Sequence, residues 1–475
     1  MQIDLVLEVL VLVIGFYMAW NIGANDVSNA MGTSVGSGAL TLRKAVIIAA
    51  VLEFSGAFFV GGNVSETMQR GLIHPDMFRT EPMVLILGMS AALLGTGVWL
   101  QIASYFGWPV STTHAIVGAI LGFGGLIGGV DAIQWGETSA IAISWVVTPL
   151  ISAMISYVVF FILQRNILYA MNPIEATKKF IPLLSFIVFS IFTLSLIFNG
   201  LQNLNLNLSF SQALGIALAI GVAASGISYL FTRRVPLPNV ENRPPSRYTP
   251  QTVVSLEKAI KHLQRVYVVS FDGTHDKVGG LLRDVRELSN QMRKETHFAD
   301  RTSDYHSVEK MFVYLQIVTA CFVAFAHGSN DVANAIGPVA AVLDTIKNGY
   351  ISDVAIVPPW LLAFGGAGIV VGLATWGWRV IETIGKKITE LTPTRGFCAE
   401  FGAATTILVA SKLGMPVSTT HCLVGAILGV GLARGMRALN LNVIRDIVLS
   451  WVITLPASAG MTILIYYGLR EIFIR

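Results

Sequence analysis

The ten residues 23–32, GANDVSNAMG, return almost unchanged as GSNDVANAIG at residues 328–337. Each copy places an aspartate, Asp26 or Asp331, within a long run of apolar residues. A carboxylate in hydrocarbon is costly, so it persists there only with a partner or beside a water-filled cavity. Two such aspartates therefore predict one polar site that is built from two halves of a membrane protein.

The composition of the chain is that of a membrane protein. Of its 475 residues, 54% are hydrophobic and 13% are charged, whereas soluble domains carry roughly 25% charged residues. Crossing a bilayer takes about 20 apolar residues, and about twelve runs are long enough. We predict an all-α polytopic membrane protein with about twelve transmembrane helices, which excludes a large soluble protein with buried helices.

The duplication extends beyond the first motif. PVSTTHAIVGAILG at residues 109–122 returns as PVSTTHCLVGAILG at residues 416–429, and the offset between the copies stays near 305–307 residues. The copies form two five-span units with two spans between them, and the odd number makes the second unit enter the membrane from the opposite side. Such inverted repeats, with discontinuous helices, are common in secondary transporters. The predicted parts are a first transmembrane repeat at 1–165, two linking transmembrane helices at 166–232, a partly helical cytoplasmic loop at 233–310 and a second, inverted repeat at 311–475.

The basic residues predict the orientation in the membrane. With the N-terminus outside, the cytoplasmic segments hold 26 Lys and Arg residues and the outside segments hold 6, as the positive-inside rule requires. Both termini are then expected outside, and the 233–310 loop in the cytoplasm. Apolar residues at helical spacing in that loop predict two amphipathic helices flanking residues 272–274. The loop lacks a catalytic constellation, which favours a connector or regulatory element.

The first motif carries candidate cation ligands. The run from Leu5 to Leu42 is too long for one straight span and too short for two, and its second half is rich in glycine. We expect its helix to break near residues 21–29, which would free backbone carbonyls for a small hard cation. A kinked helix capped by Asn-Asp is the simpler alternative, but the duplication favours an ion or substrate site. The candidate ligands are Asn25, Asp26 and Asn29 in one copy and Asn330, Asp331 and Asn334 in the other.

The second motif carries a candidate anion site. Proline begins a helix without losing a needed N–H, so we expect Ser111, Thr112 and Thr113 in the first helical turn. Hydroxyls and unpaired backbone N–H groups at this end of a helix bind anions. Ordinary capping and helix packing is the alternative, and the second copy favours the anion site. That copy supplies Ser418, Thr419 and Thr420, and each copy ends in a histidine, His114 or His421, for which packing is the favoured role.

Two further acids lie within predicted spans, Glu53 and Glu400, and the repeat offset does not relate them. Each is either a cation or proton ligand in the cavity or a buried acid paired with a helix dipole or a hydroxyl. Lysine and arginine are almost absent from the spans. Four acids would repel an anion unless cations enter with it, and this balance favours symport.

These doubled motifs resemble those of the inorganic phosphate transporter family, the phosphate permeases and sodium–phosphate symporters, over nearly the whole chain outside the 233–310 loop. The resemblance implies a membrane transporter, not an enzyme, that moves inorganic phosphate with sodium or protons and has no catalytic residues and no cofactor. Sodium is expected at Asp26, Asn29, Asp331, Asn334, Glu53 and Glu400, and phosphate at Asn25, Ser111, Thr112, Thr113, Asn330, Ser418, Thr419 and Thr420.

We expect import of phosphate by alternating-access symport with sodium across the plasma or inner membrane. Proton coupling and sulfate as the substrate stay open. An anion channel is disfavoured because the polar sites are paired and nearly closed. A membrane-embedded hydrolase is disfavoured because duplication of every part suits binding better than a division into acid, base and nucleophile. The expected partners are phosphate, sodium or protons and the lipid bilayer, without nucleic acid, and a homodimer stays open.

Overall fold

The computed structural model describes residues 2–70, 72–200, 208–235, 250–295, 301–352, 355–378, 380–381, 390–435 and 439–474. Regular structure in these residues is helical throughout, and a single isolated β-bridge joins Ile73 to Ile133. The all-α fold class predicted from the sequence is confirmed.

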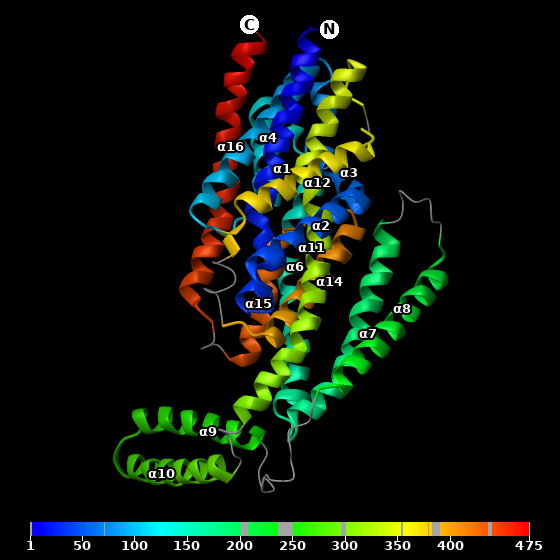
Figure 1. The fold of residues 1–475 in the computed structure, drawn as a ribbon. Coiled ribbons are helices and arrows are strands. Elements are labelled where there is room, and N and C mark those ends of the chain that lie inside the picture. The colour runs from blue at the N-terminus through cyan, green and yellow to red at the C-terminus, as the bar shows by residue number, and fades with distance from the viewer. Residues whose placement is uncertain are drawn as a thin grey trace. The chain divides into compact units, whose positions relative to one another are not determined.

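Five helices of the N-terminal part correspond to five helices of the C-terminal part. Figure 1 shows α1 running downward from the N-terminus and α11 running upward, with the C-terminal end of α16 beside the start of α1. The repeats are therefore inverted, as the odd number of predicted spans requires. The first repeat contains α1 (Gln2–Gly36), α2 (Leu42–Val60), α4 (Pro82–Tyr105), α5 (Thr112–Phe123) and α6 (Trp135–Leu163), and the second contains α11 (Arg301–Asn348), α12 (Pro359–Thr375), α14 (Pro393–Lys412), α15 (Thr419–Arg434) and α16 (Leu441–Phe473).

The described chain falls into two compact units. The larger unit comprises Met1–Phe160, Val188–Ile220 and Val313–Arg475 and contains the duplicated motifs. The smaller unit comprises Phe161–Ile187 and Gly221–Phe312. The linking helices α7 (Pro173–Gly200) and α8 (Phe210–Arg233) contribute to both, and the short helix α3 (Gly62–Arg70) follows α2.

The smaller unit contains the two amphipathic helices predicted for the 233–310 loop. They are α9 (Pro250–Val269) and α10 (Asp272–Glu295). The expected separation at residues 272–274 is wrong, because these residues form the first turn of α10, where an acidic residue is favoured by the helix dipole. Only Ser270 and Phe271 separate the helices, and the rings of Tyr267 and His275 stack across the junction with centroids 4.0 Å apart.

The predicted spans correspond to helices of different lengths. Among the described residues, seven helices are long and apolar enough to cross a membrane. The helices α5 and α15 contain 12 and 16 residues. At 1.5 Å per residue they are about 18 and 24 Å long, shorter than the roughly 30 Å of a hydrocarbon core. The twelve predicted spans therefore all fall on helices. Three of the apolar helical segments have only 10–17 residues and are shorter than a full crossing requires, namely Thr112–Gly128, Pro359–Thr375 and Thr419–Arg434.

The predicted break near residues 21–29 is wrong. Both α1 and α11 continue as α-helix through their copies of the first motif. The motif glycines serve close packing instead of bending. A Cβ added at Gly23 would lie 1.9 Å from the carbonyl oxygen of Ile369, and one added at Gly328 would lie 2.1 Å from that of Glu53. Only a residue without a side chain allows helices to approach so closely.

The discontinuities lie before the second motif instead. Residues 106–111 separate α4 from α5, and residues 413–418 separate α14 from α15. Gly107 and Gly414 lie near the start of these segments with φ angles of 68° and 66°, a conformation that glycine adopts without strain. The sequence predicted that the prolines of the second motif start these helices, and this is wrong: the prolines lie in the segments before the helices. Ser111 and Ser418 are the N-caps.

Close helix pairs join the two repeats to one another. The contacts of Gly23 and Gly328 pack α1 on α12 and α11 on α2. A Cβ added at Gly118 would lie 2.7 Å from the carbonyl oxygen of Leu455 on α16, and one at Gly425 would lie 2.3 Å from that of Pro149 on α6. Each repeat therefore packs its motif helices against the other repeat, so the two are intertwined.

Candidate functional site

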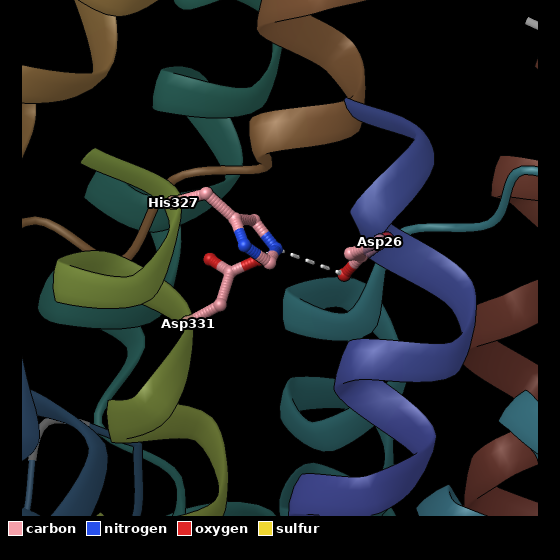
Figure 2. Close-up of side chains that lie close together, drawn as sticks. All are labelled: Asp26, His327 and Asp331. Atoms are coloured by element: carbon pink, nitrogen blue, oxygen red, sulfur yellow. Dashed lines mark ion pairs between the residues drawn. The ribbon is translucent and has the colours of Figure 1, made fainter. Parts of the chain in front are cut away.

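The two motif aspartates lie close together in the centre of the larger unit. Asp26 on α1 and Asp331 on α11 are 1% and 0% exposed. Figure 2 shows the imidazole of His327 between them. Its Nε2 lies 3.1 Å from Asp331 Oδ2 and 4.0 Å from Asp26 Oδ2. Since one atom from each of these three side chains lies within 4.8 Å of the other two, they form a single cluster.

Threonines at the start of α15 contact both aspartates. The hydroxyl of Thr419 donates a hydrogen bond of 2.9 Å to Asp331, and the hydroxyl of Thr420 lies 3.3 Å from Asp26 as its donor. The amide of Asn29 donates to Asp26 at 3.1 Å and to Thr420 at 2.8 Å. Asp26 and Asn29 of the first repeat are therefore hydrogen-bonded to the second motif of the other repeat, whereas Asp331 is bonded to the second motif of its own repeat.

The second half of the site repeats this cross-connection. The amide of Asn334 on α11 donates to the hydroxyl of Thr113 at 3.2 Å and lies 3.4 Å from that of Thr112. The duplication seen in the sequence is thus a pseudo-two-fold arrangement of contacts. The sequence prediction that two copies form one polar site agrees with this geometry.

The N-terminal ends of α5 and α15 face each other. Thr113 donates to the carbonyl oxygen of Val417, and Thr420 donates to that of Val110. The hydroxyls of Ser111 and Ser418 accept the backbone N–H groups of the histidines three residues later. The serines are therefore helix caps, the alternative considered from the sequence. The first-turn N–H groups of both helices have no intrahelical acceptor, and their dipoles favour an anion.

The first asparagine of each motif points toward the segment before α5 or α15. The amide of Asn25 donates to Ser104 and to the carbonyl oxygen of Trp108, at 3.0 and 3.1 Å. The amide of Asn330 lies 3.0 Å from the hydroxyl of Ser411 at the end of α14 and 3.4 Å from the carbonyl oxygen of Met415 in the segment that follows. These bonds hold the non-helical segments against α1 and α11.

Several buried oxygens of the site have no hydrogen-bond donor. Within the described part of the chain, no donor reaches Asp26 Oδ2, Asn29 Oδ1 or Asn334 Oδ1. Buried polar atoms are almost always satisfied, so orphaned acceptors call for an explanation. Carboxylate and amide oxygens without donors are the ligands that hard cations such as sodium take.

Glu53 joins the aspartate cluster through His327. The Nδ1 of His327 lies 3.3 Å from Glu53 Oε1, and both side chains are fully buried. Sequence reasoning missed His327. The available signal was a histidine in the apolar run directly before the second copy of the motif, where the first copy has Ile22.

Glu400 does not join this cluster and has its own set of donors. It accepts from the hydroxyls of Thr33 at 2.6 Å, Ser34 at 2.7 Å and Thr319 at 2.6 Å, and from the amide of Gln316 at 3.2 Å. These donors come from α1 and α11, so Glu400 on α14 ties three helices together. The expectation that the two glutamates are not a copied pair agrees with their different surroundings.

The histidines of the second motif pack against each other and against tryptophans. The ring centroids of His114 and His421 lie 4.3 Å apart, and those of His421 and Trp451 lie 3.6 Å apart. Trp145 lies 3.8 Å from His114 in the equivalent position. The packing role favoured from the sequence agrees with this geometry.

Two inverted, intertwined repeats of apolar helices with buried polar groups from both at their centre are an architecture common among membrane transporters. The comparison with protein families gives the family. The model of the phosphate transporter family matches residues 22–462, and the chain belongs to that family. The family consists of transporters, so the protein is not an enzyme.

Individual relatives agree with this assignment. The chain is 44% identical to a putative phosphate permease of Chlamydia pneumoniae over 472 residues, which cover 98% of this chain and 99% of the relative. It is also 44% identical to the chloroplastic inorganic phosphate transporter 2-1 of Arabidopsis thaliana, over 95% of this chain and 70% of that protein. The solved structure of a protein named the sodium-dependent phosphate transporter matches with a TM-score of 0.79 and 32% identity, covering 98% of this chain and 100% of that one.

Proposed function

We propose that this phosphate transporter imports inorganic phosphate by symport with sodium, through alternating access. The observation that carries the proposal is the convergence of both copies of both motifs on one buried point. Donor-free oxygens and two facing helix N-termini meet there, which together suit cations and an anion. The protein of the similar solved structure is named as sodium-dependent, and this likeness supports sodium as the coupling ion.

In this proposal sodium ions bind first, to oxygens of Asp26, Asn29, Asp331 and Asn334. Phosphate then binds between the ends of α5 and α15, to the hydroxyls of the four threonines and the first-turn N–H groups. The run from Leu5 to Leu42 contains no lysine or arginine. The bound cations therefore supply the positive charge that offsets the repulsion between phosphate and the aspartates.

The remaining predicted site residues have supporting roles in the proposal. Asn25 and Asn330 position the segments before α5 and α15, and Ser111 and Ser418 cap these helices. Glu400 and the hydroxyls around it form an oxygen-rich cluster for a cation apart from the aspartate pair. Glu53 contributes to the aspartate cluster through His327.

The intertwined packing changes how alternating access is pictured. Alternating access in transporters with inverted repeats is usually described as one repeat rocking against the other about the substrate. Because α1 packs on α12, α11 on α2, α5 on α16 and α15 on α6, the repeats cannot separate as rigid halves. In the proposed cycle the moving bodies are groups of helices with members from both repeats. The orientation with both termini outside, in the cell membrane, belongs to the same proposal.

Phosphate uptake into proteoliposomes under an imposed sodium or proton gradient tests this function. We expect saturable uptake of labelled phosphate that follows an inward sodium gradient and is not reduced by excess sulfate. Uptake that ignored sodium and followed a proton gradient would refute sodium coupling. Competition by sulfate at equal concentration would refute phosphate selectivity, and the absence of saturable uptake under either gradient would remove the proposal.

A further inference from the structure

A second polar region of the larger unit lies at the C-terminal end of α11. A cavity of about 20 Å³ there is bounded by α3, α4, α11 and residues that follow α11. Its polar lining consists of Gln69, Asp344, Thr345 and Ser352, and its other lining residues are apolar. Asp344 is thirteen residues from Asp331 along α11, or about 20 Å at 1.5 Å per residue. The cavity is therefore distinct from the site that the motifs form.

Gln69 on α3 lines this cavity with an unsatisfied amide. Its side chain is 5% exposed, and neither its oxygen nor its nitrogen has a hydrogen-bond partner among the described residues. Buried polar atoms are almost always paired, so an unpaired amide calls for an explanation. A leucine would fill about the same space without burying polar atoms. The amide therefore indicates that the cavity holds a polar ligand.

The charge of the lining favours a cation as this ligand. Asp344 is the single charged residue among the described residues that line the cavity, and the nearby Lys347 is exposed. Asp344 Oδ1 accepts from the amide of Asn348 at 3.0 Å, and the same amide donates to the hydroxyl oxygen of Ser352 at 3.1 Å. These two bonds hold a carboxylate and a hydroxyl close together on one side of the cavity.

The end of α11 adds negative potential to the cavity. Asp344 and Thr345 belong to its last five residues, where backbone carbonyls lack intrahelical donors and the helix dipole favours positive charge. Thr345 donates its hydroxyl hydrogen to the carbonyl oxygen of Ala341 at 2.8 Å. Its own oxygen is then left as an acceptor. The cavity thus presents oxygens from four side chains, and such oxygens suit a hard cation.

We propose that this cavity binds a monovalent hard cation such as sodium, with oxygens of Gln69, Asp344, Thr345 and Ser352 as ligands. One carboxylate balances one positive charge, and four protein ligands fall short of the roughly six to eight oxygens that calcium takes. Asp344 and Ser352 are half-buried, so water reaches the cavity, completes the coordination and accepts from Gln69 Nε2. Gln69 belongs to the first repeat and the other ligands to the second, so the ion ties α3 to α11.

The thermal unfolding midpoint of the full-length protein in detergent tests this site. It is measured in sodium chloride and in choline chloride at equal ionic strength, because choline is too large for the cavity. Gln69→Leu removes the amide, and Asp344→Asn removes the charge and keeps the shape. Glu137→Gln, at an exposed acid of the same unit, is the matched control. Each variant is also combined with Asp331→Asn, which removes a proposed sodium ligand of the central site.

For the wild type we expect sodium to raise the midpoint relative to choline, since a ligand that binds only the folded protein stabilises it. Gln69→Leu and Asp344→Asn should each lose about 2 °C of this increase, with and without Asp331→Asn, whereas Glu137→Gln should keep it. In choline, Gln69→Leu should unfold at the wild-type midpoint or above it, because the variant no longer buries two unpaired polar atoms.

A Gln69→Leu effect that is equal in sodium and in choline would overturn the proposal and would mean that the cavity holds water only. An increase that survives Asp344→Asn in full would overturn it as well, and this variant decides the question if Gln69→Leu does not fold. A larger increase in calcium chloride than in sodium chloride, abolished by Asp344→Asn, would overturn the choice of a monovalent ion. Phosphate uptake does not enter these measurements, so they stand or fall independently of the proposed symport.

Discussion

The two halves of the central site share one motif and differ in its surroundings. Around Asp331 lie His327 and Glu53, while the corresponding positions around Asp26 hold Ile22 and Ile369. Glu400 accepts from four donors, whereas its counterpart by the offset of the second motif is Leu93, a fully buried apolar residue. The shared polar residues are the duplicated part of the site, and each additional acid occurs on one side only.

This difference divides the polar residues of the site into a duplicated set and a set that occurs once. The aspartates, asparagines and threonines occur in both halves, so the proposed binding of phosphate and its ions uses them twice. The histidine and the two glutamates occur once each. These single groups make the two halves of an otherwise duplicated site chemically unequal.

The largest effect is expected for substitutions of the two motif aspartates, which occur in both halves of the site. Asp26→Asn and Asp331→Asn each remove one carboxylate and keep its shape, so we expect sodium-driven phosphate uptake to fall by about a thousandfold, equivalent to about 4 kcal/mol. Uptake into proteoliposomes measures this, and size-exclusion chromatography checks that the variants remain folded. If either variant transports at near-normal rates, that aspartate is not a cation ligand and the two halves are not equivalent in binding.

The next largest effect is expected for Glu400, which occurs in one half of the site only. Glu400→Leu copies Leu93 and leaves the donors of Thr33, Ser34, Gln316 and Thr319 without their acceptor. We expect a loss of about 3 kcal/mol in unfolding free energy, since each orphaned buried donor costs about 1–3 kcal/mol and some can turn to helix carbonyls. The thermal unfolding midpoint in detergent reports this loss.

The matched control for Glu400→Leu is Leu93→Met, a volume-conserving change that should cost less than about 1.5 kcal/mol. An unchanged unfolding midpoint for Glu400→Leu would show that the four donors find other acceptors. Glu400 would then not hold α1, α11 and α14 together.

Helix packing should respond equally in the two halves. Gly23→Ala and Gly328→Ala each place a Cβ near 2 Å from a backbone oxygen of the other repeat, and we expect each to cost about 2 kcal/mol, within the range for overpacking. Gly460→Ala on α16, where nothing lies within 4 Å of the added Cβ, should be neutral or stabilising. Unequal unfolding midpoints for the first two variants would mean that the repeats are packed less symmetrically than their contacts indicate.

The threonines should show a smaller and unequal effect. Thr420→Val removes a hydroxyl that contacts Asp26 and Asn29, and we expect the phosphate concentration for half-maximal uptake to rise about tenfold, or about 1.4 kcal/mol. Thr113→Val removes a hydroxyl that bonds to Asn334 and to the carbonyl oxygen of Val417 instead of an aspartate, so its effect should be smaller. Serine at either position should restore uptake, and failure of serine to do so would assign the effect to packing.

The smallest effect concerns a contact that lies in the second repeat. Glu390 lies 3.3 Å from both Arg395 and Arg434, near the ends of α14 and α15, and its side chain is 78% exposed. Glu390→Gln should cost less than about 1 kcal/mol because exposed ion pairs are screened by water. The unfolding midpoint at low and high salt measures it; a loss that persists at high salt would contradict a screened surface pair.

Much of the fold followed from patterns along the chain. The apolar runs predicted the helices, and the odd number of spans in each copy predicted the inversion. The glycines around Asp26 were misinterpreted as a break in the helix. Glycine allows either bending or close approach, and only the position of the neighbouring helix decides which. The backbone of Ile369, which is 346 residues away from Gly23, decided it here.

The candidate ligands also followed from the sequence, but their partners did not. The duplication identified Asp26, Asp331 and the threonines as parts of one site. It could not show that Thr420 of the second repeat contacts Asp26 of the first, because hydrogen bonds between distant segments leave no periodic signal. The sequence analysis did not identify His327 because this histidine occurs in one copy only and the duplication therefore does not mark it.

The sequence by itself determined that this protein is a membrane transporter of duplicated, inverted design, because composition, repeat and span parity are properties of the chain alone. The tertiary structure decided which groups share the site. It joined the motifs crosswise between the repeats, separated Glu400 from the aspartates and placed His327 among three carboxylates. These outcomes depend on distances of a few ångströms between helices, and such distances are set by packing that no single segment of the chain encodes.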